Sequence, residues 1–208
     1  MVADQAIFLD VGHDRYFSVG GAAAQAMQAL LEQRPASRVE LDRLLKAGLI
    51  EIGEAPQPSQ LICATVPARS LVEEGSGRAF RGLGPLIQVS ASLAKARRDV
   101  KRRPLASILD DIKSRKAGGS YPSVRSSDAR LEVAATFNAA RRFVPIKPSC
   151  LQDSLALLAC LARRRLSADL VFGVKLHPFS AHCWVQAGDI VLNDAIDHVT
   201  IHTPILVI

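Results

Sequence analysis

Residues 149–158 read SCLQDSLALL and predict a helix that begins at Cys150. The apolar residues of this stretch recur on one helix face: Leu151, Leu155 and Leu158. Ser149 followed by Gln152 fits a capping box, which places Ser149 at the N-cap and Cys150 in the first turn. There, the unpaired backbone N–H groups and the helix dipole favour the thiolate form of a cysteine.

A strand-rich segment follows the predicted helix. Residues 180–194 read SAHCWVQAGDIVLND, in which runs at 182–187 and 190–194 predict neighbouring strands joined at a Gly-Asp turn. Another β-like run covers 169–175. These elements predict an α+β core in which the cysteine helix packs on an antiparallel sheet.

Three residues in this core suggest nucleophilic catalysis. Cys150 stands at a helix start, and His182 and Asp194 lie on adjacent predicted strands, in the chain order of papain and transglutaminases. In such a triad the histidine deprotonates the thiol, and the carboxylate orients the imidazole. The alternative interpretation of a single cysteine is a small buried hydrophobe. The accompanying histidine and aspartate favour the catalytic interpretation.

The hairpin geometry gives this triad a structural test. A two-residue loop at Gly188 and Asp189 would direct Asp194 to the opposite sheet face from His182. The triad therefore predicts a loop with an odd number of residues, or a β-bulge. A tight two-residue loop without a bulge would exclude it. Asp189 and Asn193 are the nearest substitutes for the orienting carboxylate.

The remaining cysteines and histidines predict no second site. Cys160 and Cys183 are interpreted as core residues, with Cys183 on the strand face away from the catalytic histidine. His198 and His202 lie four residues apart in a β-rich tail, and neither a cysteine nor a glutamate completes a metal site. We therefore expect no metal.

The N-terminal region predicts a small separate module over residues 1–55. Runs at 6–11 and 15–19 predict two strands, an alanine-rich helix starts near Gly21, and a second helix covers 39–47. The proline-containing segment that follows predicts a linker.

Composition supports several regions in one globular chain. The 208 residues are 49% apolar and 22% charged, which excludes overall disorder. We expect a linker over 56–84 and a third region over 85–208, whose first part is a helical connector split at Pro104. Residues 85–148 carry 14 basic and 5 acidic residues, so the net charge of +6 is concentrated there.

Four separated blocks resemble the transglutaminase-like lasso peptide biosynthesis B proteins. These blocks are Cys150–Leu157, Leu170–Lys175, Pro178–Val185 and Leu192–Asp194. The resemblance implies a cysteine protease that removes the leader from a ribosomally made lasso precursor, in antibiotic biosynthesis. By position it assigns the nucleophile, base and orienting carboxylate to Cys150, His182 and Asp194. The family commonly has alanine where this chain has Cys183.

The first 55 residues resemble the recognition element for ribosomal peptide precursors that is fused to the protease in related proteins. The resemblance implies a winged-helix-like module in which the leader adds as a strand to a sheet edge beside a helix. The expected edge and groove residues are Arg15, Tyr16, Phe17, Ser18, Val19, Leu41, Leu44 and Leu45.

The resemblance also implies partners. These are the leader region of a lasso precursor and an asparagine-synthetase-like cyclase that closes the macrolactam. Some family members depend on ATP, but no G-x-x-x-x-G-K-[ST] motif reveals a site, and no cofactor is visible. The start of the chain lacks the features of a signal peptide, and no apolar run suits a membrane, so we expect a cytoplasmic protein.

Two other functions remain open. The same triad would support transglutaminase-type acyl transfer, in which an amine resolves the thioester. The protein could instead bind peptide or nucleic acid without catalysis, because six basic residues cluster between 95 and 103. Residues 81–120 contain no aromatic residue on which a base could stack, which argues against nucleic-acid binding.

Overall fold

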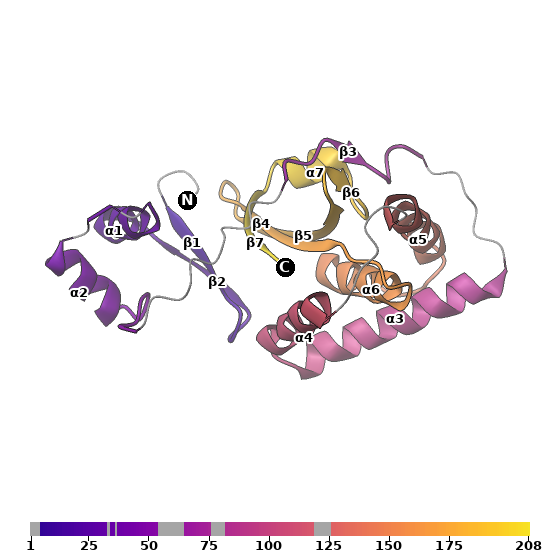
Figure 1. Ribbon diagram of the computed structural model, residues 1–208, viewed down its shortest axis with the longest axis horizontal. Coiled ribbons are helices and arrows are strands. Elements are labelled where there is room, and N and C mark those ends of the chain that lie inside the picture. Colours follow the sequence, from indigo (N-terminus) through magenta and orange to yellow (C-terminus); the bar gives the residue numbers. More distant parts are fainter. Residues whose placement is uncertain (1–4, 33, 36, 54–64, 76–81, 119–125) are drawn as a thin grey trace. The chain divides into compact units, whose positions relative to one another are not determined.

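The computed structural model describes residues 5–32, 34–35, 37–53, 65–75, 82–118 and 126–208. The chain forms two compact units, residues 1–62 and 63–208, and each is described by itself (Figure 1).

The first unit contains two strands and two helices. They are β1 (Ala6–Asp10), β2 (Arg15–Val19), α1 (Gly21–Leu31) and α2 (Arg38–Lys46), in agreement with the strands and helices predicted from the sequence. β1 and β2 pair antiparallel and form a two-stranded sheet among the described residues. The core consists of Ala26, Met27 and Leu44, with Phe8 packed against it.

The second unit packs helices against a five-stranded sheet. Its helices are α3 (Leu83–Arg102), α4 (Leu105–Gly118), α5 (Ser126–Arg141), α6 (Cys150–Arg163) and α7 (Ile196–Thr200). Its strands are β3 (Arg69–Ser70), β4 (Asp169–Lys175), β5 (Ser180–Ala187), β6 (Ile190–Val191) and β7 (Thr203–Val207). The strand order is β3-β6-β5-β4-β7. Helix α6 packs on β5, and α3 and α5 pack on α6 (Figure 1).

Part of the segment expected to be a linker belongs to this sheet. Arg69 and Ser70 form β3, which pairs in parallel with Ile190 and Val191 of β6. A two-residue strand has no detectable sequence period, so the prediction of a linker over 56–84 was wrong for these residues. Residues 54–64 and 76–81 of that segment lie outside the described part.

The helical connector divides where the sequence predicted. Pro104 separates α3 from α4, and the preceding Arg103 adopts an extended backbone, as expected before proline. The cluster of six basic residues between 95 and 103 lies on α3 and at the residue that follows it. Two of these residues, Lys95 and Arg98, pair with Asp99 on the same helix. Among the described residues, no helix is both long enough and apolar enough to cross a membrane.

A tightly packed cluster lies on the sheet face that carries Trp184. Trp184 is 1% exposed and packs with Val171, Val191 and Val199 of α7. Gly173 on β4 leaves room for this ring, because a Cβ atom there would lie 2.9 Å from the Trp184 ring and 3.0 Å from Cβ of His202. The glycine therefore permits close packing of the Trp184 and His202 side chains against β4.

Replacing Gly173 with alanine should destabilise the second unit. The added methyl group would displace Trp184 or His202, and overpacking of this kind costs about 1–3 kcal/mol. Chemical denaturation of the variant should show a correspondingly lower free energy of unfolding. Gly84→Ala is the matched control, because no heavy atom lies within 4 Å of its added Cβ. Equal stability of the Gly173→Ala variant and the unaltered protein would contradict the packing argument.

Candidate active site

Helix α6 begins at Cys150, as predicted, but its N-terminus is held differently. Ser149 occupies the N-cap position without accepting a hydrogen bond through its side chain, so the predicted capping box with Gln152 is wrong. The Asp153 carboxylate instead accepts the Ser149 backbone N–H at 3.3 Å and pairs with Arg141 at 2.8 Å. This arrangement fixes the first turn and leaves the Cys150 side chain at an exposed helix start.

The hairpin between β5 and β6 has the tight loop that was expected to exclude the triad. Gln186 pairs with Val191 and Ala187 pairs with Ile190, which leaves Gly188 and Asp189 as a two-residue loop. Gly188 has a φ of 63°, a conformation that glycine adopts without strain. The loop prediction was therefore wrong.

The chain nevertheless brings Asp194 to His182 because β6 ends early. Strand β6 ends at Val191, the Leu192 N–H still donates to the Val185 carbonyl at 2.8 Å, and the backbone then bends, whereas the prediction assumed pairing as far as Asp194. The Asn193 side chain replaces the missing backbone partner, since its Oδ1 accepts the Val185 N–H at 2.8 Å. Its Nδ2 donates to Ser154 Oγ at 3.0 Å and connects this bend to α6.

His182 and Asp194 form a direct pair. The distance from His182 Nε2 to Asp194 Oδ2 is 2.5 Å, and the two side chains are 10% and 20% exposed. The other carboxylate oxygen accepts the Ala195 backbone N–H at 2.8 Å. The buried Ser70 hydroxyl donates to the Asp194 carbonyl at 2.6 Å. Sequence analysis missed Ser70, which belongs to β3 and is distant in the chain.

The environment of Cys150 favours its thiolate. A hydrogen bond from the Cys183 thiol lowers the pKa of Cys150 most strongly, and burial opposes it. His182 lowers the pKa of Cys150 further, through a hydrogen bond and through its positive charge. The backbone N–H of Cys183 also lowers it, and the resulting pKa is about 4. The hydrogen bond to Cys150 and burial both raise the pKa of Cys183, so this second thiol stays protonated and donates.

The same contacts favour the imidazolium form of His182. Burial lowers the pKa of His182, but hydrogen bonds to Asp194 and Cys150 and their negative charges raise it to about 9. Burial raises the pKa of Asp194, whereas the hydrogen bonds from His182, His198 and Ala195 bring it below its ordinary value. A thiolate–imidazolium pair is therefore favoured between about pH 4 and 9.

Cys183 is a buried core residue, as predicted, and its thiol also interacts with Cys150. It is 3% exposed, and its carbonyl lies 3.4 Å from the Ser154 hydroxyl, one helical turn beyond Cys150. Replacing Cys183 with alanine should move the midpoint of Cys150 alkylation by iodoacetamide upward by roughly one pH unit, because a donor to the thiolate is lost. Cys160→Ala, away from the site, should leave the midpoint unchanged. An unshifted midpoint in Cys183→Ala would contradict this role.

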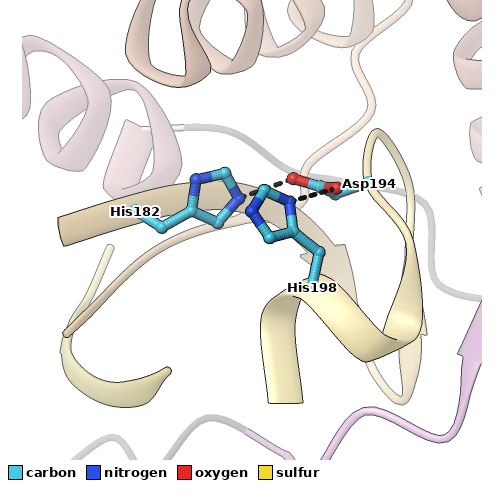
Figure 2. A group of neighbouring side chains, drawn as sticks. All are labelled: His182, Asp194 and His198. Atoms are coloured by element: carbon cyan, nitrogen blue, oxygen red, sulfur yellow. Dashed lines mark hydrogen bonds and ion pairs between the residues drawn. The ribbon is translucent and has the colours of Figure 1, made fainter. Parts of the chain in front are cut away.

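A second imidazole contacts the same carboxylate. Figure 2 shows His182 and His198 both directed at Asp194, and His198 Nδ1 lies 3.0 Å from Asp194 Oδ1. His198 belongs to α7, although the sequence predicted a β-rich tail. Each of the three residues offers one ligand atom within 4.8 Å of the others, so they could together hold a metal ion. Their hydrogen bonds to one another satisfy these atoms in the absence of a metal.

The residues expected to bind a leader lie in the first unit. Phe17 of β2 stacks on Phe8 with ring centroids 5.1 Å apart, and Arg15 pairs with Asp10 at 3.3 Å. Leu41 and Leu45 are partly exposed on α2. Leu44 is completely buried in the core of the unit, so it does not line an open groove, contrary to the prediction.

Comparisons with known proteins agree with the resemblance to lasso peptide biosynthesis B proteins. A family model described as the transglutaminase-like superfamily matches residues 90–207. The chain is also similar to the microcin J25-processing protein McjB of Escherichia coli, with 47% identity over 49 residues. That alignment covers 24% of each chain, so the chain spans about a quarter of the length of this curated relative. No solved structure matches the chain.

Proposed function

The chain belongs to the transglutaminase-like superfamily, and we propose that it is a cysteine protease that removes the leader peptide from a lasso precursor. The observation that carries this proposal is the position of Cys150 at the start of α6, beside a histidine whose Nε2 lies 2.5 Å from Asp194 Oδ2. The similarity to a protein named for processing microcin J25 supports the class of substrate.

The proposed reaction uses these residues in turn. The Cys150 thiolate attacks the scissile carbonyl carbon, and a thioester forms when the amine of the core peptide leaves with a proton from His182. Water then attacks the thioester, with His182 as the base, and releases the leader as a carboxylic acid. The backbone N–H of Cys150, in the first turn of α6, is a suitable donor to the transient oxyanion.

The first unit would supply leader recognition. β2 pairs with β1 on one edge, and a leader in extended conformation would add along the other, with Leu41 and Leu45 of α2 as the expected groove residues. Main-chain hydrogen bonds would then provide affinity, and side-chain pockets would provide specificity. The released core amine would pass to a cyclase of the asparagine-synthetase type, which joins it to a side-chain carboxylate.

Mass spectrometry of a lasso precursor incubated with the protein tests the proposal. The reaction is run with and without ATP and the cyclase, and the core peptide without its leader is the control substrate. We expect the free leader acid and the free core amine to form from the full precursor and no cleavage of the control substrate. Added hydroxylamine separates hydrolysis from acyl transfer, since preferential formation of a leader hydroxamate indicates a transferase. An intact precursor under every condition would overturn the protease proposal.

A further inference from the structure

The Asp194 carboxylate is shared between two imidazoles from different elements. Oδ2 lies 2.5 Å from Nε2 of His182 on β5, and Oδ1 lies 3.0 Å from Nδ1 of His198 on α7 (Figure 2). Ala195 donates its backbone N–H to the same Oδ1. A carboxylate held through Oδ1 has its second oxygen fixed towards His182, so rotation of the carboxylate group is restricted.

The backbone of His198 is held by His202, which lies just beyond α7. His202 Nδ1 donates to the His198 carbonyl at 2.8 Å, and His202 Nε2 accepts from the Ser180 hydroxyl at 3.0 Å. Burial lowers the pKa of His202, which favours the neutral ring that these two bonds require. The His198 ring centroid lies 4.5 Å from that of His182. The backbone that carries the His198 side chain is thus held close to the candidate base.

We infer that His198 is a positioning residue, which donates Nδ1–H to Asp194 Oδ1 and thereby aligns Oδ2 with His182. This inference rests on the proposed function, because it assigns His198 a role through the His182–Asp194 pair. In the described part of the chain, the His198 ring contacts Asp194, His182 and His202, and no contact joins it to the Cys150 thiol. Its effect is transmitted through the carboxylate, which must stabilise the imidazolium that partners Cys150.

In this role a largely exposed imidazole covers one side of a partly buried carboxylate. The His198 side chain is 54% exposed, whereas that of Asp194 is 20% exposed. Loss of His198 would leave Oδ1 with the Ala195 N–H and open this side of the carboxylate to water. The His182 imidazolium, and with it the Cys150 thiolate, would then be less stabilised.

Two substitutions separate the hydrogen bond from the remainder of the ring. His198→Ala removes the donor, whereas His198→Asn retains an amide N–H close to the position of Nδ1. Asp197→Asn is the matched control, since it changes a charge on the exposed part of the same short helix. If the His198→Ala variant does not fold, His198→Gln is used in its place. The glutamine amide lies near the position of Nε2 and not of Nδ1, so this variant also lacks the donor to Asp194.

The first measurement is the pH dependence of Cys150 alkylation by iodoacetamide, followed by mass spectrometry in the presence of EDTA. We expect a higher midpoint for His198→Ala than for the unaltered protein, and a midpoint close to normal for His198→Asn and Asp197→Asn. This measurement needs no peptide substrate, so it tests the positioning role even if the precursor is not cleaved.

The second measurement is the cleavage rate of the precursor. We expect kcat of His198→Ala to fall about 10-fold, as for loss of a hydrogen bond to a charged group, with KM little changed. His198→Asn should retain most of kcat. A normal alkylation midpoint in His198→Ala, or equal impairment of the alanine and asparagine variants, would overturn the inference.

Discussion

Replacing Cys150 with alanine is expected to lower the rate of leader removal by at least about 10⁴-fold. Without the thiol no thioester forms, and the loss of a catalytic nucleophile has effects of this size or larger in triad enzymes. Cleavage rates of the precursor, measured by mass spectrometry with the variant and the unaltered protein, check the prediction. Binding of the leader should persist, because the expected edge strand lies in the other compact unit.

Cys160→Ala is the matched control for this experiment. Cys160 lies further along the same helix, is 2% exposed and contacts the Ser92 hydroxyl at 3.5 Å. Its replacement should change stability modestly and leave the reaction intact. Equal cleavage by the Cys150→Ala variant and the unaltered protein would move the nucleophile elsewhere and remove the observation on which the proposed function depends.

The sequence predicted the elements that carry strong local signals. Helix α6 follows from the spacing of its apolar residues, although the capping box used to place its start does not form, and β4 covers the predicted range of 169–175. The division of α3 from α4 follows from the fixed backbone of Pro104. In each case the information lies within a few neighbouring residues, so the prediction does not depend on the tertiary fold.

The connections that complete the site could not be predicted in this way. The early end of β6 depends on Asn193, which replaces a backbone partner of β5 and bonds to Ser154 on α6. The contact of Ser70 with the Asp194 carbonyl joins residues 124 positions apart. The short helix that carries His198 is too brief to show a helical period. These contacts depend on residues that only folding brings together.

The second large effect is expected at Asp194. Asp194→Ala removes the carboxylate that orients His182 and stabilises its positive charge, and we expect kcat to fall by about 10³- to 10⁴-fold. The precursor-cleavage assay measures this loss. Asp189→Ala is the matched control, because Asp189 occupies the hairpin turn and was the alternative carboxylate considered from the sequence. A strong loss in Asp189→Ala, with near-normal activity in Asp194→Ala, would reverse the assignment.

Asp194→Asn separates the negative charge from the hydrogen-bonding oxygen. The charge of Asp194 helps to raise the pKa of His182 to about 9, so its loss should lower the pH above which the imidazolium is deprotonated. When the imidazolium form of His182 is less stable, it also stabilises the thiolate less, so the pKa of Cys150 should rise from about 4. The ion pair would therefore exist over a narrower pH range, reduced from both sides. Iodoacetamide alkylation reports the acid side, and NMR titration of His182 reports the alkaline side. Unchanged limits in Asp194→Asn would show that the carboxylate charge does not control the pair.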